Sequence, residues 1–270
     1  MLRIAFLLLM GTLAGCAGTR PQLPVSHRHN PLTGAAFYAK AAGWGWQQRD
    51  SLAVSEILAG NMPGRLRKLR PVPVQITDSA TGRQVSAVFY VTTDYLAIGP
   101  SANWARVPLT PMAAQRIADS FRCYLPTPRL VDAIYRSAKV KLEPIPMYAF
   151  RDSTPTLWQH HLIIEGQRQG REGLIAGIKK DVVVSNRLLQ DARGHRVAIY
   201  GWHRPDGKPI QPLYTGHVDW YVDYSHGIRL VWHRVKVNGR WMEYEEVLAH
   251  RLYRRLISDE YVPIARYPKQ

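Results

Sequence analysis

The sequence predicts a single domain of the α+β class, and three observations support this prediction. The chain has 270 residues, a length that allows one large domain or two small ones. Hydrophobic residues make up 46% of it, and its 8 Trp, 14 Tyr and 5 Phe are enough to fill a sizeable core. Helical patterns are concentrated in the middle of the chain and short strand patterns toward the C-terminal half. We therefore expect a mixed or antiparallel sheet with several packed helices.

The N-terminus has the layout of a secretory signal. Met1-Leu2-Arg3 precedes an apolar run from Ile4 to Leu13, which is too short to span a bilayer. The segment Leu13-Ala14-Gly15-Cys16 resembles the lipobox of bacterial lipoproteins, in which the peptide is cut before the cysteine and the cysteine is acylated. The resemblance implies a signal peptide over residues 1–15 and lipidation of Cys16. The alternative is an ordinary signal peptide with a cysteine at its cleavage site.

The same residues indicate where the mature chain resides. Several acyl chains give stable anchoring in a membrane, and Ala17 after the cysteine favours the outer membrane of a two-membrane bacterium. The formal net charge of +16 falls only to about +15 when Arg3 leaves with the signal peptide. Because export argues against nucleic acid as a partner, we expect the positive charge to face anionic lipid, peptidoglycan or anionic polysaccharide.

The rest of the chain is expected to be a tether over residues 16–34 and one domain over residues 35–270. Pro, Gly, Ser, His and Asn are frequent in the tether, which lacks apolar periodicity. Pro111 and Pro128 each stand at the start of a helical pattern, and Asn238-Gly239 is typical of a tight hairpin turn. The expected helices cover residues 36–58, 111–121, 128–138, 156–169 and 244–257, and the expected strands cover residues 72–76, 85–92, 175–185, 196–202, 220–224 and 228–237.

Histidines indicate where the chemistry of the domain is concentrated. Five of the ten histidines lie between residues 195 and 233, among several aspartates and aromatic residues. Histidine is the side chain that titrates near neutrality, so we expect His217 and His226 to act as general base and acid, with Asp223 as the orienting carboxylate. Ser225 is a candidate nucleophile or substrate contact, although a histidine-activated water is the preferred nucleophile. Alternatively, the histidines are partly exposed fillers on edge strands.

The segment Ser225-His226-Gly227-Ile228-Arg229-Leu230 resembles the L,D-transpeptidase signature, Ser-His-Gly-Cys followed by an apolar residue and Arg. Ile228 replaces the nucleophilic cysteine of that family, so the transpeptidase reaction does not carry over. His203 lies roughly where the family has an upstream site histidine, and it is a further catalytic candidate. Segments between residues 90 and 232 are also similar to a family of bacterial secreted proteins and lipoproteins without an assigned activity, which implies an exported enzyme or a binding protein equally.

Substrate-binding candidates surround this cluster. Lys179 and Lys180 with Asp181 precede a buried strand, where such charges can hold a carboxylate or phosphate, or can form a solvated surface ion pair. Arg229 is expected to anchor an anionic substrate group. Aromatic residues can stack on sugar rings or fill the core, and those selected as candidate contacts are Trp202 and Tyr224.

Metal binding is the competing use of these residues. His203, His217, His226 and Asp223 suit zinc as ligand types, but their spacing matches no zinc motif that we can name. We expect no metal and no cofactor. Cys123 shows no partner histidine in its sequence context and is expected to be a small buried hydrophobe.

Together these features predict a lipid-anchored cell-envelope hydrolase that acts on peptidoglycan or another envelope polymer. Two alternatives remain open at the level of the sequence. The first is a non-catalytic lipoprotein that binds peptidoglycan or anionic polysaccharide, and the second is a structural component of an envelope assembly. A catalytic site requires His217, Asp223 and His226 to converge, directly or through one water.

Overall fold

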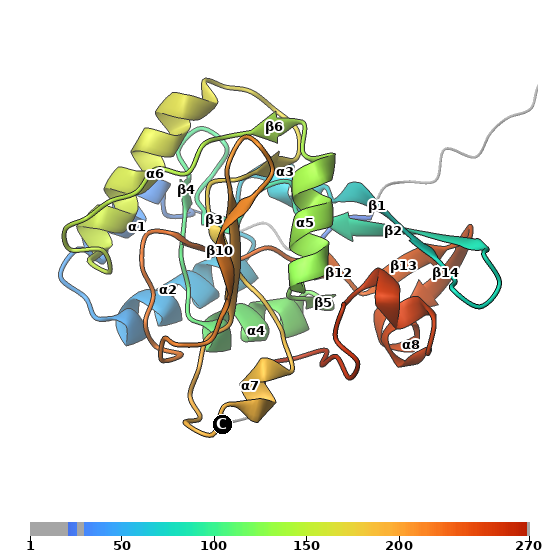
Figure 1. Cartoon of the computed structure of the whole chain (residues 1–270). Coiled ribbons are helices and arrows are strands. Elements are labelled where there is room, and N and C mark those ends of the chain that lie inside the picture. Colours follow the sequence, from blue (N-terminus) through green and yellow to red (C-terminus); the bar gives the residue numbers. More distant parts are fainter. Residues whose placement is uncertain (1–20, 26–29, 269–270) are drawn as a thin grey trace, which may run out of the picture.

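Two main sheets and the helices around them make up the α+β fold of the computed structural model (Figure 1). The structure describes residues 21–25 and 30–268, so the expected signal peptide and Cys16 lie outside the described residues. Within the described ranges, no helix is long and apolar enough to cross a membrane. The helices are α1 (Gly34–Lys40), α2 (Trp46–Leu58), α3 (Gly64–Arg67), α4 (Pro111–Ser120), α5 (Pro128–Ser137), α6 (Thr154–Arg168), α7 (Arg187–Gln190), α8 (Tyr244–Ala249) and the 3-10 turn η1 (Tyr253–Leu256).

The first sheet is antiparallel and has the strand order β14-β13-β2-β12-β5, with β1 paired to β2. The predicted hairpin is confirmed: β1 and β2 run side by side in a register from Arg70 opposite Val91 to Thr77 opposite Gln84. Alternate residues of both strands are buried, as expected when one face of a sheet covers a core. The strands of this sheet are β1 (Arg70–Thr77), β2 (Gln84–Val91), β5 (Cys123–Tyr124), β12 (Val231–Trp232), β13 (Arg234–Val237) and β14 (Arg240–Glu243).

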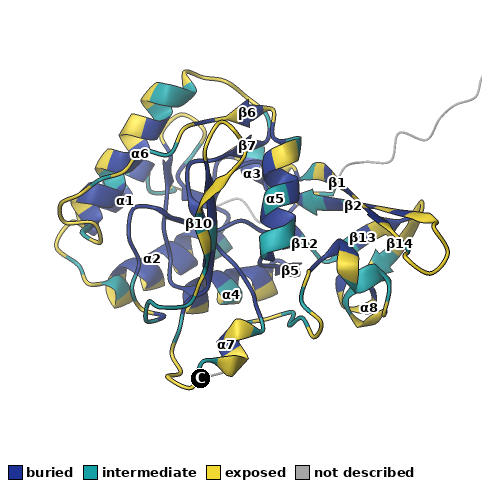
Figure 2. Cartoon of the chain, in the orientation of Figure 1, coloured by how far each residue is buried: buried dark blue, intermediate teal, exposed yellow. Residues whose placement is uncertain are grey.

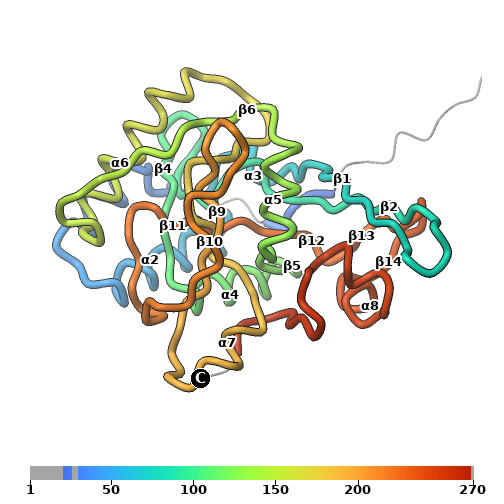
Figure 3. Tube along the Cα trace, in the orientation of Figure 1, coloured from blue at the N-terminus to red at the C-terminus, as the bar shows by residue number. Residues whose placement is uncertain are grey.

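The second sheet is mixed and has the order β10-β9-β8-β11 (Figure 3). Its strands are β8 (Lys180–Val182), β9 (Ile199–His203), β10 (Pro209–Tyr214) and β11 (His226–Gly227). The pair of β8 with β11 is parallel and sets His226 opposite Lys180. Two short pairs, β3 (Ala97–Ile98) with β4 (Ala105–Arg106) and β6 (Val140–Lys141) with β7 (Ile175–Ala176), complete the strands of the described chain.

Helix α5 stands between the two sheets and contacts both β1 and β9 (Figure 1). It begins as the sequence predicts, because the Thr127 hydroxyl accepts a hydrogen bond from the Leu130 amide and Pro128 occupies the first turn. Helix α4 begins in the same way after Thr110. The buried residues fill the interior between helices and sheets (Figure 2), with one large apolar cluster around Phe37 and Leu230 and another around Phe89.

Some expected elements differ from the structure. The helix expected over residues 36–58 is two helices, because Gly43 and Gly45 lie in the break between α1 and α2. Residues 220–224 form a turn and irregular loop, although their pattern predicts a strand. The expected strand 228–237 is divided into β12 and β13, and the expected C-terminal helix is divided into α8 and η1.

The expected tether contributes to the fold from residue 21 onward. The Leu23 amide donates to the Arg67 carbonyl at 2.9 Å, and the Leu69 amide donates to the Pro21 carbonyl at 3.1 Å. The Leu23 side chain is 4% exposed and packs in the larger apolar cluster. Pro21 and Leu23, which lie within the expected tether, therefore contact the domain.

Candidate functional site

The loop before β11 brings three candidate residues together at the end of the second sheet. The Asp223 carboxylate accepts hydrogen bonds from the Ser225 amide at 2.8 Å and from the Ser225 hydroxyl at 2.5 Å. An aspartate that bonds the backbone two residues ahead stabilises a tight turn. The turn leads directly into β11, where His226 follows, so the sequence Asp-Tyr-Ser-His folds locally into a compact polar unit.

Asp223 is fully buried and holds its negative charge. Its Oδ2 atom accepts hydrogen bonds from Arg151 at 2.9 Å and from the Tyr221 hydroxyl at 3.3 Å. Burial alone raises the pKa of this carboxyl, but His226, the two bonds from Ser225 and nearby Lys180 together lower the pKa below its usual value. The carboxylate is therefore ionised at neutral pH.

His226 is the most unusual residue of the cluster. It is 1% exposed, and neither ring nitrogen has a hydrogen-bond partner among the described residues. Its Nε2 atom lies 3.9 Å from the Asp223 Oδ1 atom. Burial lowers the pKa of the ring to about 4, against the opposing effect of Asp223, so the imidazole is neutral at pH 7. A buried polar group without a partner costs about 1–3 kcal/mol, which indicates a place for a polar ligand.

Aromatic side chains form the outer layer of the cluster. The half-buried His217 ring lies 6.4 Å from His226 and 4.6 Å from Tyr221, measured between ring centroids. Tyr214 contacts His217 from the other side at 5.2 Å. Burial also lowers the pKa of His217. Both histidines thus stand close together in their neutral forms, with His226 inside and His217 toward the surface.

Lys180 brings positive charge to the inner layer. The parallel pairing of β8 and β11 places it opposite His226, and its ammonium group lies 5.1 Å from the centre of the Trp202 ring. The side chain is buried, and burial lowers its pKa, while Asp223 acts in the opposite direction. With neutral histidines, Lys180, Arg151 and Asp223 give the site a net charge of +1.

Asp181 and Arg229 lie in the interior, behind this cluster. Arg229 is fully buried and donates to the carbonyls of Thr92 at 2.8 Å and Ile175 at 2.7 Å. Asp181 accepts a hydrogen bond from the Tyr95 hydroxyl at 3.0 Å, and burial raises its pKa to about 6. In place of the expected anchor for a substrate, Arg229 therefore joins β-strand ends inside the protein.

Lys179 and Tyr224 lie beside α6, where both contact His160. The Lys179 ammonium group contacts His160 Nδ1 at 3.2 Å and donates to the Tyr224 carbonyl. Burial, followed by the charge of Arg106, lowers the pKa of Lys179 to about 7. The Arg151 guanidinium lies 5.5 Å from the centre of the Tyr224 ring, so Tyr224 also borders the Asp223 cluster.

His203 lies apart from the other histidine candidates. Its Nε2 atom is 2.9 Å from the Asp132 Oδ1 atom, and its ring stacks on Tyr135 at 4.4 Å. Tyr200 donates a further hydrogen bond to Asp132 at 3.0 Å. This group joins β9 to α5, so the structure gives His203 a partner outside the Asp223 cluster.

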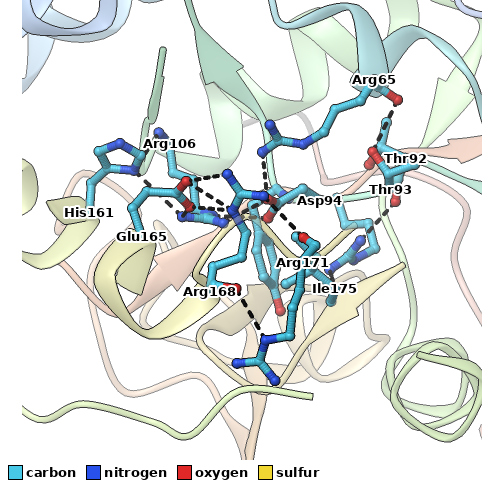
Figure 4. Close-up of polar contacts among 12 residues, drawn as sticks. Arg65, Thr92, Thr93, Asp94, Arg106, His161, Glu165, Arg168, Arg171 and Ile175 are labelled. Atoms are coloured by element: carbon cyan, nitrogen blue, oxygen red, sulfur yellow. Dashed lines mark hydrogen bonds and ion pairs between the residues drawn. The ribbon is translucent and has the colours of Figure 1, made fainter. Parts of the chain in front are cut away.

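A second buried network surrounds Asp94 (Figure 4). Arg106 binds the Asp94 carboxylate with two hydrogen bonds, of 2.9 and 2.7 Å, and Arg65 adds a third of 3.0 Å. Glu165 bridges Arg106 and Arg168. Asp94 is fully buried in this charge network, whose members come from distant segments.

Arg151 and Tyr221 are the members of the cluster that sequence reasoning missed. Arg151 lies in a segment without clear periodicity, so no local pattern indicates that it reaches Asp223. Tyr221 stands between the two aspartates of the loop, and only its place in the histidine-rich region is a sequence indication.

The arrangement is suited to proton transfer. It contains two neutral imidazoles, one ionised carboxylate and two cations within a short distance of one another. Across the described part of the chain, no group of three or more His, Cys, Asp or Glu side chains is placed to hold a metal ion. The Cys123 thiol is buried, and burial raises its pKa, which is typical of an unreactive cysteine.

In comparisons with known proteins, the chain matches no protein-family model, no curated protein and no solved structure.

Proposed function

We propose that the chain is a lipid-anchored hydrolase of peptidoglycan or another cell-envelope polymer, with His226, Asp223 and His217 at its reaction centre. The observation that carries this proposal is the buried His226 ring, neutral and without a hydrogen-bond partner in the described structure, 3.9 Å from an ionised carboxylate. Groups whose pKa values are displaced by burial and by specific neighbours are typical of catalytic sites.

Water is the better nucleophile in this arrangement. The Ser225 hydroxyl is fully buried and donates its proton to Asp223 at 2.5 Å. A serine nucleophile requires a base that accepts its proton during attack, and the partner of the Ser225 hydroxyl is Asp223, whose lowered pKa makes it a weak base. Ser225 therefore positions Asp223, and a water molecule activated by a histidine attacks the substrate.

Burial assigns the main proton-transfer role to His226. A neutral imidazole can take a proton from water, and Asp223 at 3.9 Å then stabilises the imidazolium that forms. The same ring can return the proton to the leaving group. His217 was expected to be the base from its sequence position, but its half-buried ring, outside His226, suits contact with the substrate or proton relay.

Lys180 and Arg151 provide the electrostatic part of the mechanism. Both cations lie near Asp223, and the net charge of +1 favours negative charge that develops on a substrate oxygen. Loss of one such preorganised donor in an enzyme site lowers kcat by roughly 10²–10³. The positive site also matches the acidic character of envelope polymers.

Attachment to the membrane fits the way the chain joins the domain. Pro21 already contacts the fold, and five residues of extended chain span at most about 18 Å. With lipid on Cys16, the domain would be held directly beside the membrane surface. We predict that Cys16→Ser moves the protein from the membrane fraction to the soluble fraction, as measured by immunoblotting; an unchanged membrane fraction would contradict the lipid anchor.

Digestion of isolated sacculi tests the hydrolase proposal. The full chain, purified in mild detergent, is incubated with sacculi, and released fragments are identified by mass spectrometry. We expect release by the wild type, none by His226→Gln, and unchanged release by His233→Gln, because His233 pairs with Glu243 at 2.7 Å outside the site.

Two outcomes of this experiment would contradict the proposal. If the wild type releases nothing and instead sediments tightly with the sacculi, the protein is a binding lipoprotein. If His226→Gln releases fragments as the wild type does, another group is responsible for the hydrolysis.

A further inference from the structure

An aromatic cavity of about 500 Å³ opens beside the proposed reaction centre. Its walls include Trp44, from the connection between α1 and α2, and Trp46, the first residue of α2. Trp220 and Tyr221, from the loop that precedes β11, complete its aromatic lining. The three tryptophans are partly exposed, and Trp220 is 45% exposed. Two segments far apart in the sequence thus present flat aromatic surfaces to one hollow.

Tyr221 connects this cavity to the reaction centre. It lines the cavity, and its hydroxyl also donates to Asp223 at 3.3 Å. Asp152 also lines the cavity and directly follows Arg151, which binds the same Asp223 carboxylate. A molecule in the cavity would therefore lie next to the groups that carry out proton transfer.

Arg49 gives the cavity an unsatisfied donor. It lines the cavity although it is only 2% exposed, and its Nε atom lacks a hydrogen-bond partner in the described ranges. Its Nη1 atom has a long contact of 3.5 Å with the Thr154 hydroxyl. The neighbouring Asp50 accepts hydrogen bonds from the Thr110 amide at 2.9 Å and hydroxyl at 2.7 Å, and its other oxygen forms a buried ion pair with the Arg49 Nε at 3.8 Å. The guanidinium is therefore charge-paired but has no short hydrogen bond, and a polar ligand in the cavity would supply one.

We propose that this cavity is a subsite for a sugar residue of a glycan strand, an inference that rests on the proposed function. Pyranose rings have flat apolar faces that pack on aromatic side chains, and their hydroxyl, acetamido or carboxylate substituents accept hydrogen bonds from a guanidinium. The combination of several partly exposed aromatic rings and one buried arginine is complementary to both features. The subsite places the substrate class in the glycan part of the envelope polymer.

Calorimetric titration of the full chain with a soluble tetramer of N-acetylglucosamine tests the subsite. We expect the wild type to bind and Trp220→Ala to raise the Kd by about tenfold, because aromatic anchors in a binding site commonly contribute more than 1 kcal/mol. The matched control is Trp241→Ala, which removes a tryptophan of similar exposure, 40%, on β14, and this variant is expected to keep the wild-type Kd.

Binding and hydrolysis can fail separately in this design. Binding of the tetramer by the wild type without any cleavage of sacculi would contradict the hydrolase and support the subsite. Lack of binding to the tetramer, or equal affinity of wild type and Trp220→Ala, would overturn the subsite. Binding of free stem peptides in the same cavity, lost in Trp220→Ala, would also overturn it by showing a peptide site.

Discussion

The neutral form of one buried histidine sets the acid limit of the proposed reaction. Burial lowers the pKa of His226 to about 4, so the ring is ready to accept a proton at any pH above that value. On the alkaline side, Lys180 must stay protonated to stabilise negative charge, and burial lowers its pKa from the usual value of about 10.4.

We predict a broad pH profile for release of fragments from sacculi. Activity should fall on the acid side near pH 4 and on the alkaline side below the usual pKa of lysine. Lys180→Arg keeps a cation that does not titrate, so its alkaline fall should move to higher pH. An acid fall near pH 6.5, the value of an exposed histidine, would contradict the role of the buried ring.

Ser225 and Asp223 are expected to contribute unequally to kcat. Ser225→Ala removes one of several hydrogen bonds to Asp223, so we expect kcat to fall by no more than about tenfold and the pKa of Asp223 to rise. Asp223→Asn removes the negative charge that stabilises the imidazolium, and we expect a loss of roughly 10³–10⁴ in kcat. Steady-state kinetics with a soluble fragment of the polymer as substrate measures kcat for both variants. Complete inactivity of folded Ser225→Ala would instead indicate a serine nucleophile.

The pairing of β8 with β11 assembles the site. At Gly227, on β11, the neighbouring side chains leave no room for a Cβ atom. A Cβ atom at Gly227 would lie 2.4 Å from Tyr95 Cδ1 and 2.7 Å from Lys179 Cβ. We predict that Gly227→Ala lowers the free energy of unfolding by about 1–3 kcal/mol or more, because a packed core resists an added methyl group. Urea denaturation measures the change.

Gly166→Ala is the matched control for this prediction. Gly166 lies in α6, and a Cβ atom there would meet open space. Alanine is the better helix former, so this variant should gain about 0.5–1 kcal/mol. Equal stability of Gly227→Ala and the wild type would mean that the β8–β11 contact is looser than the structure indicates.

Local sequence patterns predicted the helices whose ends are set by neighbouring residues. Helices α4 and α5 were predicted within one residue at each end, because a threonine cap and a proline define their starts. Residues 220–224 were wrongly predicted as a strand, since aromatic and β-branched residues dominate the segment while Asp223 uses its side chain to hold a turn.

The same limit applies to the candidate site. His217, Asp223 and His226 could be grouped from the sequence because ten positions contain all three. The approach of Arg151 and the pairing of Lys180 with His226 depend on contacts between distant segments, which no local pattern reveals. Arg229 belongs to the segment that resembles the transpeptidase signature, but its guanidinium donates to backbone carbonyls inside the fold.

At the scale of the whole molecule, the interior holds several titratable groups in their neutral forms. Burial lowers the pKa values of His160 and His161 to about 2 and of His226 to about 4, with nearby cations adding to the effect. In the unfolded chain these rings have pKa values near 6.5 and take up protons that the folded protein excludes. Asp181 acts in the opposite direction, because burial raises its pKa to about 6.

The free energy of unfolding should therefore fall as pH decreases below about 6.5. Near pH 5 the unfolded chain binds about three more protons on His160, His161 and His226, and about one fewer on Asp181, than the folded protein. A net difference of about two protons corresponds to roughly 2–3 kcal/mol per pH unit. Asp181→Asn removes the opposing group, so its loss of stability between pH 7 and pH 5 should be steeper. Urea denaturation at a series of pH values measures both slopes, and a wild-type stability that is constant from pH 7 to pH 5 would show that these histidines are not held neutral by burial.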